Sequence, residues 1–177
     1  FAKLVVSVLF FVNIGILIGE FFPAYNIFEL FVGKQRDFIG LARFENAGSL
    51  ISPIPAEPHC TSFLLYSPQA VINTLFRPFP SEISSLLMVP AVLENVLLFV
   101  FILFAILFHR KQIKHARIIY FCLFFSLLLS VITGITTPVL GALVRYRIPV
   151  LPFLYIALFL IIDFNKIARF LKIKSSV

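Results

Sequence analysis

Residues 86–108 read LLMVPAVLENVLLFVFILFAILF, an apolar run that contains a single charged residue, Glu94. A helix needs roughly 20 apolar residues to cross the hydrocarbon core of a bilayer, so this run predicts a transmembrane helix. Three further runs predict spans at Leu4–Phe22, Ile118–Ile135 and Ile148–Ile162. Because 60% of the 177 residues are hydrophobic and 13% are charged, we expect an all-α, polytopic membrane protein with about four transmembrane helices.

Basic residues beside these runs predict the orientation of the spans. The loop 109–117 and the tail 166–177 are both rich in Lys and Arg, and such segments stay in the cytoplasm. Spans at 1–22 and 86–108, and two more within 118–165, then place both termini in the cytoplasm and residues 23–85 outside. The net charge of +7 is explained by topology, so we expect no nucleic-acid partner.

The outer segment 23–85 is rich in proline and predicts short helices. Asp37–Leu50 has a modest helical pattern, and the sequence 53-PIPAEP-58 interrupts regular structure. Ser67 resembles an N-cap followed by proline at the first helical position, which predicts a helix that Pro78 and Pro80 end. These helices lie either in the membrane interface, with Phe76 and Phe79 toward lipid, or in a small external cap on the bundle.

Small residues predict where helices pack. Gly15 and Gly19 form a G-x-x-x-G pattern in the first run, which allows close approach of a second helix. A ridge of small residues recurs every four positions in the third run: Cys122, Ser126, Ser130 and Gly134. Either face could dock another membrane subunit, or both could pack within the chain's own bundle.

Two arginines flank Tyr146 just before the last run, in 141-GALVRYRIPVLP-152. Because Ile148 precedes Pro149, it is biased toward an extended conformation, and residues two apart in an extended segment face the same side. Arg145 and Arg147 are therefore predicted to face one anion together, beside the N-terminus of the last helix. The alternatives are that they bind lipid head groups or pair with carboxylates.

Glu94 is the one acid placed well inside a predicted span, where a carboxylate is costly enough to suggest a function. It is predicted either to pair with Arg145 or Arg147 or to serve as a catalytic or substrate-orienting group. The cluster 57-EPHC-60 lacks the four ligands of a zinc site. We expect neither a metal nor a cofactor.

A resemblance extends loosely over residues 70–163. The sequences 77-RPFP-80, Leu93-Glu94-Asn95 and 137-TPVLGALVRYRIPVLP-152 together are similar to the C-terminal portion of bacterial polytopic glycosyltransferases and O-antigen polymerase-like envelope-glycan proteins. This resemblance implies an inner-membrane location and a polyprenyl-phosphate-linked sugar as substrate. It also implies that Arg145 and Arg147, with Arg77, hold the lipid-linked phosphate at the outer face.

Enzymatic activity stays open, because the chain carries no serine-nucleophile motif, P-loop or dinucleotide loop. The alternative function is a non-catalytic subunit of a larger membrane complex, with lipids and other membrane subunits as partners. Half of a transporter is a weaker third alternative, since Glu94 is the one charged residue placed well inside a predicted span.

Overall fold

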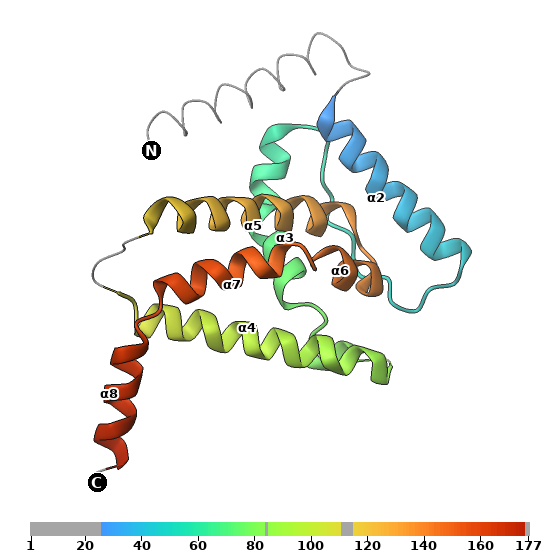
Figure 1. The fold of residues 1–177 in the computed structure, drawn as a ribbon. Helices are drawn as coiled ribbons and strands as arrows, with labels where there is room; N and C mark the ends of the chain where they lie inside the picture. The colour runs from blue at the N-terminus through green and yellow to red at the C-terminus, as the bar shows by residue number, and fades with distance from the viewer. Residues whose placement is uncertain (1–25, 84, 111–114, 176–177) are drawn as a thin grey trace. The chain divides into compact units, whose positions relative to one another are not determined.

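The structure, a computed structural model, describes residues 26–83, 85–110 and 115–175, with side chains to residue 170. Every regular element in these ranges is helical, as the sequence predicts (Figure 1). The chain divides into two compact units. Unit 1 comprises Phe1–Arg77 and Leu129–Arg147, and unit 2 comprises Pro78–Leu128 and Ile148–Val177.

Unit 1 contains three helices and the last part of a fourth. These are α2 (Ile27–Phe44), α3 (Cys60–Phe76), α6 (Leu140–Tyr146) and the end of α5 (Ala116–Thr136). Its core is a cluster of buried apolar side chains: Val32, Ile54, Ala56, Phe63, Ala70 and Ile135. Gln35 is buried beside this core, and its Nε2 donates to the carbonyl of Ile54 at 2.8 Å and to that of Ile135 at 2.7 Å. One amide group thereby joins α2 to the 45–59 connection and to α5.

The first outer helix occupies a different range from the predicted Asp37–Leu50. It begins at Ile27 because Asn26 is an N-cap, whose Oδ1 accepts hydrogen bonds from the backbone N–H groups of Phe28 and Glu29. It ends at Phe44, and Asn46 then adopts a positive φ of 50°, a conformation that Asn tolerates better than most residues. The periodic pattern therefore marked the last turns of a longer helix.

The second outer helix also begins earlier than predicted. Helix α3 starts at Cys60, so Pro68 lies in its interior and Ser67 is no N-cap. Proline has no N–H and cannot bond the carbonyl four residues earlier, which here belongs to Leu64. The hydroxyl of Ser67 donates to that carbonyl at 2.8 Å and replaces the missing bond. The predicted stop is confirmed, since α3 ends at Phe76, just before Pro78.

The predicted ridge on α5 packs inside the chain. In unit 1, the hydroxyl of Thr74 on α3 donates to the carbonyl of Ser130 at 2.8 Å, and a Cβ on Gly134 would overlap the backbone of Ala70. In unit 2, the hydroxyl of Ser126 donates to the carbonyl of Val150 at 3.3 Å. Cys122 belongs to a buried cluster with Ile119 and Ala157. All four ridge residues are buried, so the ridge serves contacts within the chain.

Unit 2 contains the first part of α5, the helices α4 (Val89–Leu107), α7 (Val150–Ile161) and α8 (Phe164–Ser175), and the short 3-10 turns η2 (Pro80–Glu82) and η3 (Leu86–Met88). Helix α4 runs beside α7 (Figure 1). The ring of Phe101 contacts the rings of Tyr155 and Phe159 across this pair, with centroids 5.6 and 5.1 Å apart. An isolated bridge joins His109 to Ile162 at one end.

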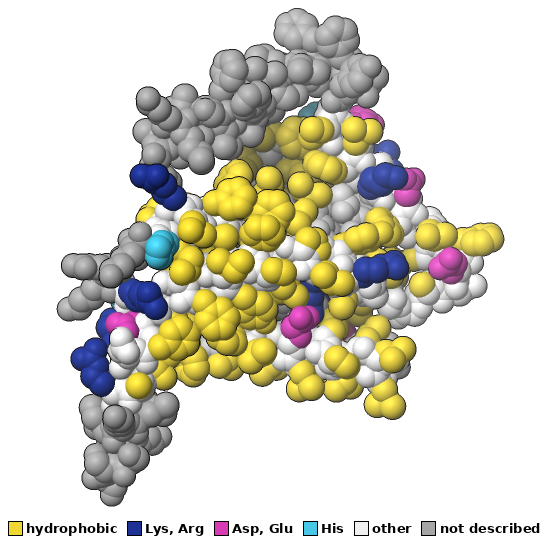
Figure 2. All heavy atoms as spheres, in the orientation of Figure 1, with side chains coloured by type: hydrophobic (Ala, Val, Ile, Leu, Met, Phe, Trp, Pro, Cys, Tyr) yellow, Lys and Arg dark blue, Asp and Glu magenta, His cyan; other side chains and the backbone are white. Residues whose placement is uncertain are grey.

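Two of the described helices are long and apolar enough to cross a membrane, at Leu86–Leu107 and Ala116–Thr136. These ranges confirm the second and third predicted runs as apolar helices. The last predicted run is the shorter α7, and it reaches the length of a span only if α6 and α7 together form one bent span. The first predicted run, with Gly15 and Gly19, lies outside the described residues. Figure 2 shows the extensive hydrophobic surface that such helices need in lipid.

Candidate functional site

Arg147 is the most deeply buried of the three predicted arginines. It is the C-cap of α6 and is 0% exposed, the largest fully buried side chain of the described residues. Its Nη1 donates to the backbone carbonyl of Arg77 at 3.0 Å and to that of Leu75 at 3.5 Å. Both carbonyls belong to the C-terminal end of α3. The guanidinium therefore caps a helix end, where carbonyl groups favour a positive charge.

The local sequence explains why these carbonyls need a donor from elsewhere. In a continuing helix, Leu75 would accept from the backbone N–H of Phe79. The chain turns extended at Arg77 before Pro78, and the N–H of Phe79 donates to a carboxylate oxygen of Glu82 at 2.9 Å instead. Arg147, 72 residues away in sequence from Leu75, fills this position.

The predicted extended conformation of residues 145–147 is wrong. Arg145 lies in the last turn of α6, and Arg147 follows with φ −79° and ψ −11°, a helical conformation. Side chains two positions apart on a helix point roughly 200° away from each other. Arg145 is accordingly exposed while Arg147 is buried, so the two do not face one target together. Residues 147–149 form a turn between α6 and α7, so the proline at 149 does not make the preceding residues extended.

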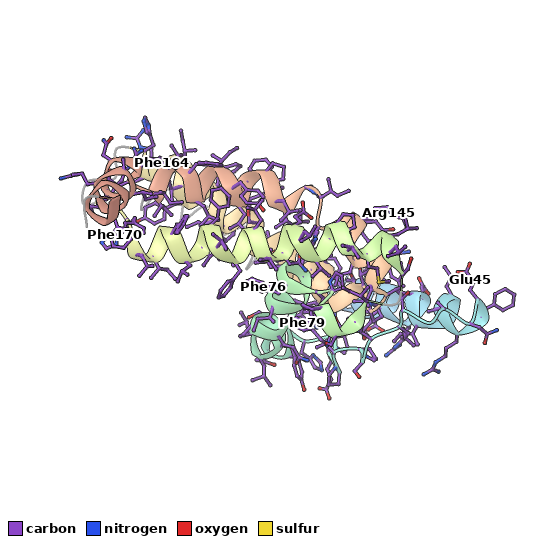
Figure 3. The ribbon with its side chains drawn as sticks, turned by 90° about the horizontal axis from the view of Figure 1, so that it is seen from below. Glu45, Phe76, Phe79, Arg145, Phe164 and Phe170 are labelled. Carbon is purple, nitrogen blue, oxygen red and sulfur yellow. The ribbon has the colours of Figure 1, made fainter. Side chains whose placement is uncertain are left out.

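Of the three predicted arginines, Arg145 and Arg77 are the two whose side chains are not fully buried. Arg145 is exposed and is labelled in Figure 3. Its guanidinium carbon lies 5.6 Å from the ring centroid of Tyr146. Tyr146 in turn contacts Phe38 of α2, with ring centroids 5.9 Å apart. Arg77 is half-buried, and Arg147 bonds its carbonyl. Three arginines thus belong to the ends of α3 and α6, and their side chains differ in burial: Arg147 is fully buried, Arg77 is half-buried and Arg145 is exposed.

Glu94 lies in the second turn of α4 and is half-buried. Its neighbour Asn95 is buried, and the Asn95 Nδ2 donates to the carbonyl of Pro78 at 3.0 Å. This bond holds the loop before η2 against the first turns of α4. Glu94 belongs to unit 2 and the arginines belong to unit 1, so an ion pair between them stays a prediction, as does a catalytic role.

The cluster at residues 57–60 lies where α3 begins. The backbone N–H of Glu57 donates to the hydroxyl of Ser62 at 2.9 Å, and His59 is the N-cap residue of α3. Within the described residues, no three His, Cys, Asp or Glu side chains gather in a way that could hold a metal ion.

Sequence reasoning missed the role of Leu75 and Arg77 as backbone acceptors. Pro78 predicts the end of α3, where the last backbone carbonyls have no donor within the helix. No local sequence pattern identifies the residue that donates to them. Comparisons of the chain with protein-family models, with curated proteins and with solved structures gave no match. The resemblance to envelope-glycan proteins therefore stays a prediction.

Proposed function

We propose that the chain is an integral membrane module of cell-envelope glycan assembly that binds the phosphate of a polyprenyl-linked sugar. Arg145 and Arg77 contact the phosphate in this proposal, and Arg147 positions them by holding the ends of α6 and α3 together. The observation that carries it is the bond from Arg147 to the backbone carbonyl of Arg77 at 3.0 Å, because it holds the end of α3, which bears Arg77, against the end of α6, which bears Arg145. The proposed location is the bacterial inner membrane, with the arginines at the outer face.

Chemistry favours an anion at this place. Arg77, Arg145 and Arg147 place positive charge at the ends of α3 and α6, and a bound anion offsets repulsion between positive charges. Arginine binds phosphate oxygens with paired N–H donors. Arg145 and Arg77 are positioned from helix ends rather than from a free loop, which lowers the cost of ordering them on binding.

Binding of a lipid phosphate by variants tests the proposal. The full chain is placed in nanodiscs that contain a polyprenyl phosphate, and bound lipid is measured by native mass spectrometry. Arg145→Gln and Arg77→Gln are each expected to weaken binding by about tenfold or more, since each removes a hydrogen bond to a charged group. Arg36→Gln is the matched control, because Arg36 is an exposed arginine of the same unit.

Unchanged binding in the Arg145→Gln, Arg77→Gln double variant would refute the proposal, provided that the protein still inserts. Sugar transfer is a separate measurement on the same samples. Loss of transfer in Glu94→Gln with binding retained is the result expected if Glu94 is the catalytic group, and retained transfer would remove it from that role.

A second candidate function is a non-catalytic subunit that docks through α4. Among the residues that the structure describes, few cover this helix, and its exposed side chains include Leu93 (64%), Leu97 (51%) and Ile106 (66%). Lipid covers such a surface as well as a protein partner does, so a substitution is needed to distinguish contact with lipid from contact with a subunit. Leu93→Trp with Leu97→Trp is tolerated against fluid lipid but clashes in a packed helix interface. Loss of a co-purifying subunit would support docking, and its retention would reject it.

A further inference from the structure

Helix α8 begins at a sharp break after α7. Ile162, the C-cap of α7, is extended with ψ 133°, and α8 begins two residues later at Phe164. The carboxylate of Asp163 accepts hydrogen bonds from the backbone N–H groups of Asn165 and Lys166, at 3.1 and 3.4 Å, as an N-cap does. Figure 1 shows α8 leaving α7 at a steep angle. The hydrogen-bonded turn at Asp163 thus sets the direction of α8 relative to α7.

Hydrogen bonds anchor this turn to the end of α4. The backbone N–H of Asp163 donates to the carbonyl of Phe108 at 2.8 Å, and the backbone N–H of Arg110 donates to that of Ile161 at 2.9 Å. The side chain of Arg110 also donates from Nε to the carbonyl of Ile162, at 2.9 Å. Lys166 donates from Nζ to the carbonyl of His109, at 2.6 Å. Because α4 is long enough to cross a membrane, α8 starts at the level where that helix ends.

The side chains of α8 divide into an apolar and a polar face. Phe164, Ile167 and Phe170 recur at intervals of three residues, and at 100° per residue Asn165 lies roughly 140° from Phe170 around the helix. Phe170 is 56% and Phe164 47% exposed, and both are labelled on α8 in Figure 3. Asn165 and Arg169 are exposed as well, so the helix presents both faces outside the core.

The apolar face points toward the span it adjoins. The ring of Phe170 lies 5.7 Å from the ring of Phe108 at the end of α4, and the ring of Phe164 lies 6.0 Å from that of Phe159 on α7. Figure 2 shows Lys and Arg side chains gathered where α8 begins, next to the hydrophobic surface of unit 2. The sequence of α8 contains Lys and Arg at four positions and no acid.

We propose that α8 lies in the interface of an anionic membrane. Phe164 and Phe170 insert at the level of the acyl boundary, and the basic residues contact lipid phosphates. The physical reason is that a helix with one apolar and one cationic face is attracted both by the hydrophobic region and by negatively charged head groups. Its attachment to the end of α4 already holds it at that surface, which removes most of the entropy cost of membrane binding.

Accessibility of labelled side chains tests the proposal on the full chain. Nitroxide labels are placed at Phe170→Cys and Asn165→Cys in a Cys60→Ser, Cys122→Ala background. Nanodiscs contain phosphatidylcholine alone or phosphatidylcholine with phosphatidylglycerol. With phosphatidylglycerol present, we expect the label at residue 170 to be accessible to oxygen and shielded from a water-soluble nickel complex. The label at residue 165 should show the opposite pattern.

Charge neutralisation tests the electrostatic part. Arg169→Gln, Lys172→Gln and Lys174→Gln together should lower the ratio of inserted to water-exposed helix by roughly fivefold for each charge removed. The matched control removes three exposed basic residues of α2, with Lys34→Gln, Arg36→Gln and Arg43→Gln, and should leave the label at residue 170 unchanged.

Three results would overturn the proposal. The first is equal access of the nickel complex to residues 165 and 170. The second is insertion that is independent of phosphatidylglycerol. The third is shielding of both labels from oxygen as well as from nickel, which is what a covering protein chain produces.

Discussion

Replacing Arg147 is the sharpest test of the fold of unit 1. The side chain is fully buried and donates to two carbonyls at the end of α3, at 3.0 and 3.5 Å. Arg147→Gln keeps a polar group but removes the charge and shortens the reach. We expect the free energy of unfolding to fall by about 2–4 kcal/mol.

The magnitude follows from opposing contributions. A hydrogen bond from a charged group contributes about 1.5–3 kcal/mol, and the 3.0 Å bond to Arg77 falls in that class. The 3.5 Å bond to Leu75 is at the limit of hydrogen-bonding distance and contributes little. A cation at a partly buried helix C-terminus adds up to about 2 kcal/mol. Relief of the cost of burying a guanidinium offsets part of the loss.

The assay is equilibrium unfolding in mixed micelles by sodium dodecyl sulfate, followed by circular dichroism. Arg147→Lys keeps the charge but has no planar fork, so it should recover part of the loss. Arg145→Gln is the matched control, since Arg145 is exposed on the same helix, and should change stability by less than about 0.5 kcal/mol. Two results would contradict the capping role of Arg147: an Arg147→Gln variant as stable as the unsubstituted protein, or an Arg145→Gln variant that loses as much free energy of unfolding as Arg147→Gln.

Three further substitutions test the packing of the described residues by the same unfolding assay. Gly134→Ala places a Cβ against the backbone of Ala70 and should lower the free energy of unfolding by about 1–3 kcal/mol. Gly141→Ala on α6 is the control, because its Cβ meets open space, and it should raise the free energy of unfolding by about 0.5–1 kcal/mol. The reverse order would contradict the close approach of α3 and α5. Gln35→Met leaves two buried carbonyls without their donor and should cost about 2–4 kcal/mol, so a neutral result would exclude that amide as a link between elements. Asp163→Ala removes the N-cap of α8 and should lower the helical content measured by circular dichroism, with a cost of about 0.5–2 kcal/mol; unchanged helicity would show that the cap is dispensable.

The apolar runs of the sequence determined which segments are helices suited to a membrane. The predicted runs at 86–108 and 118–135 match the helices Leu86–Leu107 and Ala116–Thr136 closely, because the length of an apolar run and the end of a helix before proline are local properties. The starts of the two helices predicted in the outer segment were misplaced by ten residues for α2 and eight for α3. Their caps and the hydroxyl that compensates Pro68 depend on single polar side chains, which periodicity does not register.

The site depended on tertiary structure. The sequence identified Arg77, Arg145 and Arg147 as a set, but it predicted that the two later arginines face one side. Only the fold places Arg147 under the end of α3 and leaves Arg145 outside. The small-residue ridge on α5 shows the same division. Its spacing predicted a contact with another helix, but only the fold shows the partners, which are α3 at Ser130 and Gly134 and residue Val150 of α7 at Ser126. Spacing along one helix fixes which side chains share a face, whereas the identity of what covers that face depends on residues far away in the chain.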